Sequence, residues 1–220
     1  MTGAKRRWIF GLLGLALLAL TGCADDDPYE ARRLALVGVL DSPHDLQGAS
    51  QLTLSYFDPW SQRIHSARIY SDQPSGGDIA FDPVANTYLL SQGPSVLLFG
   101  VDAADPHRPE FRAFLDFPLD GATGGPVIPL DAEILAATLK LSVEFVDFAS
   151  RAPVLLDLVH YSVTRGLRPE DFSSPPLAVS AFEILDFDAG GEVLIDVTPL
   201  MAAAQRLGLV DFQVRFALGR

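Results

Sequence analysis

Apolar and polar residues alternate with a period of two along several segments in the second half of the chain. The clearest segments are residues 137–145, 193–197 and 210–218, and a fourth covers 112–117. Such alternation predicts strands that are buried on one side of a sheet. Elsewhere, short apolar segments are separated by Gly, Pro, Asp and Ser, which is typical of sandwiches and barrels. The pattern therefore predicts an all-β domain.

The last segment shows the expectation most clearly. Its apolar side chains are predicted to face the core: Val210, Phe212, Val214, Phe216 and Leu218. Its polar side chains are predicted to face outward: Asp211, Gln213 and Arg215. The alternation of apolar and polar residues in the segment 137–145 shifts by one position after Phe145, which predicts a β-bulge near that residue.

Further strands and one helix follow from local composition. Additional strands are predicted at 51–57, 62–70, 87–91, 96–100, 154–163 and 182–188. The first two would form a hairpin (51–70) around the turn at 58–61. For the helix, Thr198 is predicted to cap the start, Pro199 suits the first position, and Leu200–Leu207 follows. Gly208 is predicted to end it, so the helix precedes the last strand.

The first 23 residues have the parts of a secretory signal. Lys5, Arg6 and Arg7 precede an apolar stretch of 13 residues, 8 to 20. This stretch is shorter than the ~20 residues that a membrane-spanning helix needs. The ending Leu20-Thr21-Gly22-Cys23 resembles the lipobox of bacterial lipoproteins. We therefore expect a signal peptide at 1–22, an acidic tether at 23–33 and a single β-sandwich domain at 34–220.

The lipobox resemblance implies that Cys23 becomes an acylated N-terminus. Such proteins carry a diacylglycerol and an amide-linked acyl chain, and several chains anchor a protein stably. The resemblance thus implies a lipid bilayer as partner, and a position at the cell envelope. Ala24 after the cysteine resembles lipoproteins of the outer membrane in bacteria that have two membranes. Acylation would also account for a single cysteine in an exported chain.

Composition restricts the partners of the exported chain. The sequence has 28 Asp and Glu and 16 Lys and Arg, of which three basic residues lie in the signal, so the rest carries 13 − 28 = −15. This charge gives no electrostatic basis for binding nucleic acid or anionic lipid. With Cys23 acylated, no disulfide can form. Stability must therefore come from the hydrophobic core.

The order of several segments resembles a known family. These are Asn86-Thr87-Tyr88-Leu89, Arg112-Ala113-Phe114-Leu115-Asp116-Phe117, Ile134-Leu135-Ala136-Ala137-Thr138-Leu139 and Asp196-Val197-Thr198-Pro199-Leu200. Residues 86–218 look like the DNRLRE-type, disaggregatase-related carbohydrate-binding module. The resemblance implies a jelly-roll-like antiparallel β-sandwich and a polysaccharide ligand. The chain departs from the pattern at Asn86, where an acidic residue is common, and residues 34–75 lie outside it.

Catalytic motifs are missing from the sequence. It has no G-x-S-x-G elbow, no H-E-x-x-H helix and no zinc-like spacing of its four histidines. Two carboxylate pairs, Asp186 with Asp188 and Asp116 with Asp120, have the residue types of a glycoside hydrolase. Solvation at the surface or pairing with arginine is the favoured explanation for both pairs. We therefore expect no enzyme activity, and a hydrolase is kept as a minor alternative.

Calcium is a candidate structural ligand. The loop residues Asp102 and Asp105, or Asp78 and Asp82, offer the hard oxygen ligands that Ca²⁺ prefers. No EF-hand pattern is present, and solvated loops are the alternative explanation.

The predicted hairpin holds the candidate sugar-binding residues. Trp60 lies in its turn, and Tyr56, Arg68 and Tyr70 are close by in the sequence. The alternative is that Trp60 packs over the edge of the sandwich, because Trp is usually well buried. The sequence thus predicts a lipid-anchored, non-catalytic protein that binds polysaccharide. A structural or assembly lipoprotein that binds an envelope protein is the alternative.

Overall fold

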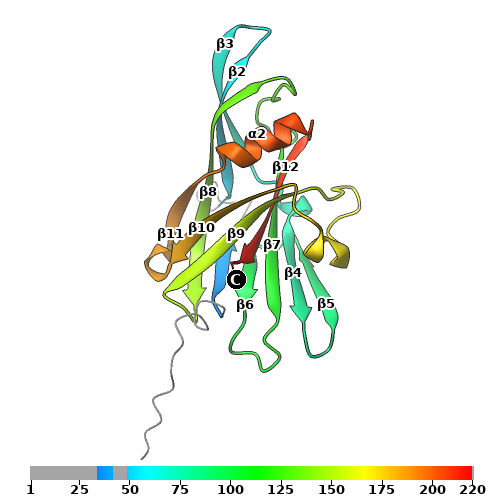
Figure 1. Cartoon of the computed structure of the whole chain (residues 1–220), viewed down its shortest axis with the longest axis vertical. Helices are drawn as coiled ribbons and strands as arrows, with labels where there is room; N and C mark the ends of the chain where they lie inside the picture. The colour runs from blue at the N-terminus through cyan, green and yellow to red at the C-terminus, as the bar shows by residue number, and fades with distance from the viewer. Residues whose placement is uncertain (1–33, 42–48, 220) are drawn as a thin grey trace, which may run out of the picture.

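Twelve β-strands and one α-helix form the part of the chain that the structure describes, residues 34–41 and 49–219. The structure is a computed structural model, shown in Figure 1. The strands pair antiparallel throughout and form one curled sheet. The prediction of an all-β, sandwich-like fold with one short helix before the last strand is therefore confirmed.

The strands are β1 (Leu36–Leu40), β2 (Gln51–Asp58), β3 (Arg63–Tyr70), β4 (Gly77–Asp82), β5 (Thr87–Gln92), β6 (Val96–Val101), β7 (Glu110–Pro118), β8 (Glu133–Asp147), β9 (Arg151–Val159), β10 (Ala178–Leu185), β11 (Gly191–Asp196) and β12 (Asp211–Leu218). The helix is α2 (Thr198–Arg206), and three short 3-10 turns are η1 (Gln73–Ser75), η2 (Pro169–Ser173) and η3 (Asp186–Asp188).

The longest strand, β8, organises one half of the sheet. Its first part pairs with β2 on one side and its middle with β11 on the other, and its last part pairs with β1. The register with β1 shifts where Gly38 faces Phe145 and Val39 faces Val143, so Glu144 is the extra residue. The predicted bulge is therefore present, one residue before Phe145.

The other half contains the strands in the order β10-β9-β12-β7, with β4 and β5 continuing from β7. The two halves are joined where β6 pairs with β7 at Gly100–Phe111 and Val101–Glu110. Curling of the sheet brings their apolar faces together. The main core accordingly combines side chains such as Leu139 and Leu141 of β8 with Val214 and Phe216 of β12.

Helix α2 covers the open side of this core, against β8, β10 and β12. It begins at Thr198, one residue earlier than a capping role for that residue requires. The Thr198 hydroxyl instead donates to Asp196 Oδ1 (2.6 Å) and accepts the Ala137 amide (2.9 Å). Within the described residues, no helix has the length and apolar character needed to cross a membrane.

The segment between β9 and β10, residues 160–177, covers the outer face of β4, β7, β9 and β12. A second apolar cluster forms beneath it, from Ile79, Phe114, Val159, Tyr161, Leu167 and Phe172. As a result, Gln213 and Arg215 of β12 are buried, although the alternation predicted that they face outward. Val210 was predicted to face the core, but it precedes β12 and is exposed.

Two strands, β1 and β4, were not predicted from the sequence. Four of the five residues of β1 and four of the six residues of β4 are buried, on both faces of the sheet. A strand buried on both faces shows no alternation of apolar and polar residues, so its sequence lacks the periodic signal.

Candidate functional site

Trp60 lies at the tip of the hairpin formed by β2 and β3. The two strands pair in register from Gln51–Tyr70 to Asp58–Arg63, and residues 59–62 form the turn. Asp58 Oδ1 accepts the backbone N–H of Trp60 at 2.9 Å, and Gln62 adopts a positive φ of 57°. This local geometry places the indole outside the sandwich, where it is 83% exposed.

The exposed indole is held by a residue from a distant part of the chain. Trp60 Nε1 donates a hydrogen bond of 2.6 Å to Asp131 Oδ2, in the loop that leads into β8. The bond fixes one edge of the ring and leaves its faces to solvent. A large aromatic side chain exposed in this way loses little conformational entropy when a ligand packs against it.

Polar side chains also lie at the hairpin tip. Ser61 Oγ and His65 Nε2 are 3.0 Å apart, and the His65 ring stacks on Tyr56 with centroids 5.6 Å apart. Hydrogen bonds from the Ser61 hydroxyl and the Trp60 amide hold the pKa of Asp58 below its usual value. The hairpin tip therefore presents an aromatic ring beside hydroxyl, imidazole and carboxylate groups.

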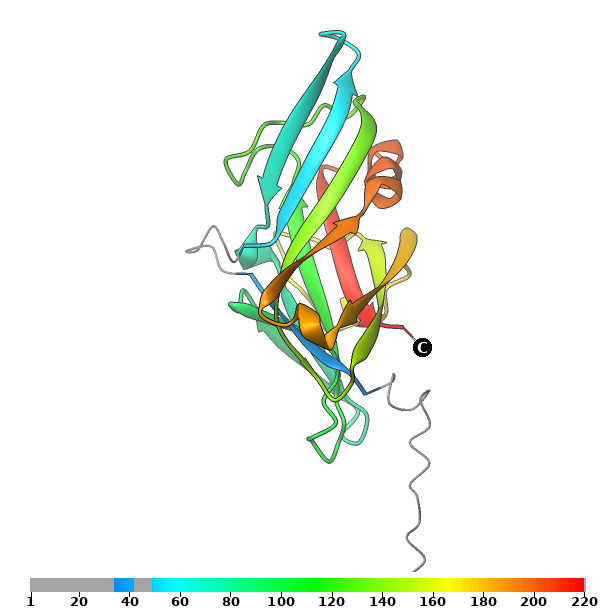
Figure 2. The same cartoon turned by 90° about the vertical axis from the view of Figure 1, so that its left-hand side faces the viewer.

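The hairpin tip and the start of the described chain lie at opposite ends of the molecule (Figures 1 and 2). Phe57, next to the tip, pairs with Glu133 at the beginning of β8, whereas Leu36 pairs with Asp147 at its end. The 15 residues of β8 span about 45 Å at the usual rise per residue of a strand. Trp60 is thus far from the point where residues 1–33 join the fold.

The other candidate residues of the hairpin do not gather around Trp60. The Tyr56 side chain is buried beneath His65, so its ring is not available for stacking on a ligand. Arg68 is exposed on β3, where it pairs with Thr53. Tyr70 ends β3, at the opposite end of the hairpin from the tip.

Tyr70 lines a separate pocket of about 300 Å³, together with Asp41, Ser71 and Asp72. Burial raises the pKa of Asp41 to about 6, although the Ser71 hydroxyl donates a hydrogen bond to its Oδ1. Its Oδ2 is buried and has no hydrogen-bond partner in the described part of the chain. A raised carboxyl pKa is a property of acid–base catalysts, but the Asp41 side chain is almost completely enclosed.

The aspartates proposed as calcium ligands mainly organise turns. Asp102 Oδ1 accepts the amides of Ala104 and Asp105, and Asp105 Oδ1 accepts the amide of His107. Asp82 Oδ2 lies 2.8 Å from His107 Nδ1. In the described ranges, no three His, Cys, Asp or Glu side chains are grouped so as to hold a metal ion.

Asp78 lies apart from this loop and is buried on β4. Its Oδ2 accepts the Leu98 amide at 3.3 Å. Burial raises the pKa of Asp78 to about 6, which is unlike a carboxylate prepared to bind calcium.

The two carboxylate pairs are not arranged as catalytic dyads. Asp186 and Asp188 belong to η3 rather than to a strand, and Asp188 Oδ2 accepts the Leu185 amide at 2.8 Å. Asp116 is buried in β7, whereas Asp120 is exposed and accepts the Ala122 amide. In each pair, one carboxylate thus accepts an amide of its own turn: Asp188 in the first pair and Asp120 in the second.

Sequence reasoning missed Asp131 and Asp41, the two residues that define the tip and the pocket. Asp131 is 71 positions from Trp60, and no local pattern links them. Asp41 directly follows the unpredicted strand β1. Cys23 and the tether at 24–33 lie outside the described residues.

No family of known proteins matches this chain, and neither a curated protein nor a solved structure is significantly similar to it. Lipidation of Cys23 and the likeness to carbohydrate-binding modules stay predictions from sequence.

Proposed function

We propose that this chain is a lipid-anchored, non-catalytic protein of the cell envelope that binds polysaccharide at the tip of its β2–β3 hairpin. The observation that carries the proposal is the exposed Trp60 indole, held in place by Asp131. The apolar face of a sugar ring packs on such an aromatic face, and neighbouring polar groups bind its hydroxyls. Ser61 and His65 supply such groups here.

The position of the tip supports this role. A protein tethered through Cys23 is joined to the bilayer at the Leu34 end of its domain. The tip lies at the opposite end of β8, so the indole would point away from the membrane and toward envelope polymers. An open tip also suits a long polysaccharide, because both ends of the polymer can extend beyond the binding site. A closed pocket would not allow this.

The hydrolase alternative has one observation in its favour, the pocket with Asp41 and Asp72. Both candidate carboxylates accept a hydrogen bond from a serine: Ser71 donates to Asp41, and Ser75 donates to Asp72 Oδ2. A general acid must reach the leaving group of its substrate within hydrogen-bond distance. The enclosed Asp41 side chain does not offer that reach, so binding at Trp60 is the proposal that the geometry supports better.

Tryptophan fluorescence tests the proposal directly. The sequence has two tryptophans, Trp8 and Trp60, and Trp8 leaves with the signal peptide, so Trp60 is the single emitter of the lipidated chain. The lipidated chain in neutral detergent would be titrated with a neutral β-glucan, a chito-oligosaccharide and a uronic-acid polymer. We expect the emission to shift to shorter wavelength with at least one polymer, because stacking removes water from the indole.

The control variant separates stacking from general apolar contact. Phe187 in η3 is also an aromatic residue at the surface, 77% exposed and distant in sequence. Trp60→Ala should weaken retention on the immobilised polymer at least tenfold, about 1.4 kcal/mol, whereas Phe187→Ala should leave it unchanged. Repeating the titration with EDTA tests calcium separately. If no polymer is bound, or if both variants lose binding equally, the proposal is wrong.

A further inference from the structure

Strand β5 forms a free edge of the sheet. It pairs with β4 from Gly77–Gln92 to Asp82–Thr87 in unbroken register. No other strand in the described part of the chain pairs with it. The backbone groups on its outer side are therefore available to a further strand.

This edge lacks the features that usually prevent edge-to-edge pairing. Free edges are commonly protected by charged residues, prolines or bulges. The other edge strands carry charged side chains: β3 has Arg63 and Arg68, β10 has Glu183, and β11 has Glu192 and Asp196. By contrast, β5 reads Thr-Tyr-Leu-Leu-Ser-Gln and has none of these protections.

Apolar side chains are exposed along the same edge. Leu89 is 74% exposed, and Tyr88 and Leu90 are also exposed to a smaller extent. Tyr88 packs partly against Phe81 of β4 and Phe172 of η2, so the face of β5 that carries Tyr88 is partly covered. Leu89 is adjacent in sequence and points to the opposite face of the sheet. Its side chain contributes apolar surface that a partner would remove from water.

The two ends of β5 differ in charge. At the Gln92 end, Gly166 lies against the Gln92 side chain, so its neighbour Arg165 is at this end. Arg165 is exposed and has no salt-bridge partner within residues 34–41 and 49–219, whereas Arg168 is followed by the acidic Glu170 and Asp171 of η2.

At the Thr87 end, Asp82 and Asp105 gather around His107. Hydrogen bonds from the Ala85 amide and from His107 hold the pKa of Asp82 below its usual value, so it is ionised at neutral pH. The edge thus has Arg165 at one end and an acidic group of side chains at the other.

We propose that β5 pairs antiparallel with β5 of a second copy of the chain, across a two-fold axis, and joins two sheets into one. An antiparallel arrangement places the Gln92 end of each protomer beside the Thr87 end of the other. Arg165 of one copy then faces Asp82 and Asp105 of the other, twice per dimer. A parallel arrangement would place like charges together, so the charges select the antiparallel one.

The size of this interface predicts a weak dimer. One six-residue strand per protomer is about 20 Å long, which gives an interface at the small end of the range for specific complexes. A dissociation constant of about 1–100 µM is therefore expected. Two anchored copies on one bilayer would meet at higher effective concentration, which favours pairing. The dimer does not depend on polysaccharide binding at Trp60.

Sedimentation of the full chain in density-matched neutral detergent, over about 1–200 µM, tests the dimer. Leu89→Lys places two like charges near the two-fold axis and should weaken association at least tenfold. Leu194→Lys is the matched control, because Leu194 is a 68% exposed leucine on the β11 edge. It should leave association unchanged.

Charge reversal tests the antiparallel orientation. Arg165→Glu and Asp105→Arg should each weaken the dimer, and the double variant should recover it, since each new charge then meets its opposite. Circular dichroism of each variant checks that the sheet is intact. A chain that is monomeric at every concentration, an equal effect of Leu89→Lys and Leu194→Lys, or a double variant without recovery would each overturn the proposal.

Discussion

Asp116 lies in the interior of the sheet, although the sequence gives it an unremarkable place in a strand. Its Oδ1 is buried and has no hydrogen-bond partner among the described residues. Burial raises the pKa of Asp116 to about 7, and the carboxylates of Asp211 and Asp72 add to the shift. Asp41 and Asp78 are also buried, with pKa values of about 6.

These carboxyls predict that the protein becomes less stable as the pH rises from about 4 to 7. The unfolded chain loses the Asp116 proton near pH 3.9, whereas the folded protein holds it to about pH 7. The folded state therefore binds more protons in this interval, and the free energy of unfolding falls with pH. Asp116→Asn should remove the part of this dependence that Asp116 contributes, and stabilise the protein at pH 8 by about 2–4 kcal/mol.

Urea unfolding of the full chain at pH 5 and pH 8 measures this effect. Asp120→Asn is the control, because Asp120 is exposed in the turn after the same strand. Its variant should follow the wild type at both values. If the stability of Asp116→Asn changes with pH as much as that of the wild type, Asp116 is not the group that titrates.

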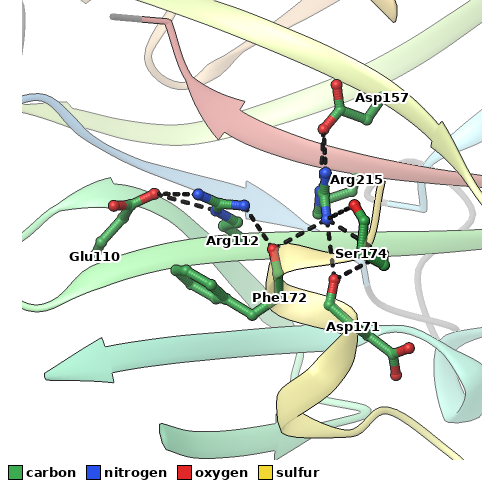
Figure 3. A network of polar contacts seen from close by, with 7 residues as sticks. All are labelled: Glu110, Arg112, Asp157, Asp171, Phe172, Ser174 and Arg215. Carbon is green, nitrogen blue, oxygen red and sulfur yellow. Dashed lines mark hydrogen bonds and ion pairs between the residues drawn. The ribbon is translucent and has the colours of Figure 1, made fainter. Parts of the chain in front are cut away.

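Among the elements, the segment 160–177 depends on a buried arginine (Figure 3). Arg215 Nη2 lies 2.5 Å from Asp157 Oδ2, and its Nη1 donates to the carbonyl oxygens of Asp171, Phe172 and Ser174. Arg112 donates to the Phe172 carbonyl from the other side and lies over its ring, 4.0 Å from the centroid. The segment is therefore attached to β7 and β12 through η2.

Replacing Arg215 should release this attachment. Arg215→Met leaves Asp157 buried without its partner, and breaking a buried pair in this way costs about 3–5 kcal/mol. Arg151→Met is the comparison, because Arg151 pairs with Glu183 at the surface and such pairs contribute about 1 kcal/mol or less. Denaturant unfolding gives both values, and faster backbone amide exchange in 160–177 should accompany the first.

An equal cost for the two variants would contradict the importance given to Arg215. A loss of stability without faster amide exchange in 160–177 would show that Arg215 stabilises another part of the sheet rather than this segment.

At the scale of the whole molecule, the position of Trp60 relative to the start of the fold determines which end of the domain points away from the membrane. If Cys23 is acylated, the Leu34 end is nearest the bilayer and Trp60 is farthest from it. In vesicles that contain the lipidated chain and doxyl-labelled lipid, Trp60 fluorescence should therefore be unquenched. Phe148 follows β8 beside the start of β1, so it marks the near end of the domain.

The matched control moves the fluorophore to that near end. A Trp60→Phe, Phe148→Trp chain should be quenched by the same lipids, because its indole lies close to the bilayer. Quenching of Trp60 to the same extent would show that the domain lies flat on the membrane, and the proposed presentation of the hairpin would be wrong.

The alternation of residues determined the strands that have one exposed face. Leu139 and Leu141 alternate with Thr138 and Lys140, and β8 indeed buries the first pair more deeply than the second. Local chemistry also determined the helix before β12 and the hairpin turn, which was predicted at 58–61 and lies at 59–62, because both depend on neighbouring residues. These features are local, so the sequence alone was sufficient for them.

Tertiary structure decided the features that join distant segments. Gln213 and Arg215 are buried only because residues 160–177 fold back over β12. Trp60 is held by Asp131, and the charged ends of β5 come from two different loops. Such contacts form between residues far apart in sequence, and their energies depend on the curl of the sheet. No local pattern contains that information, and for this reason the candidate site could be predicted only as far as Trp60.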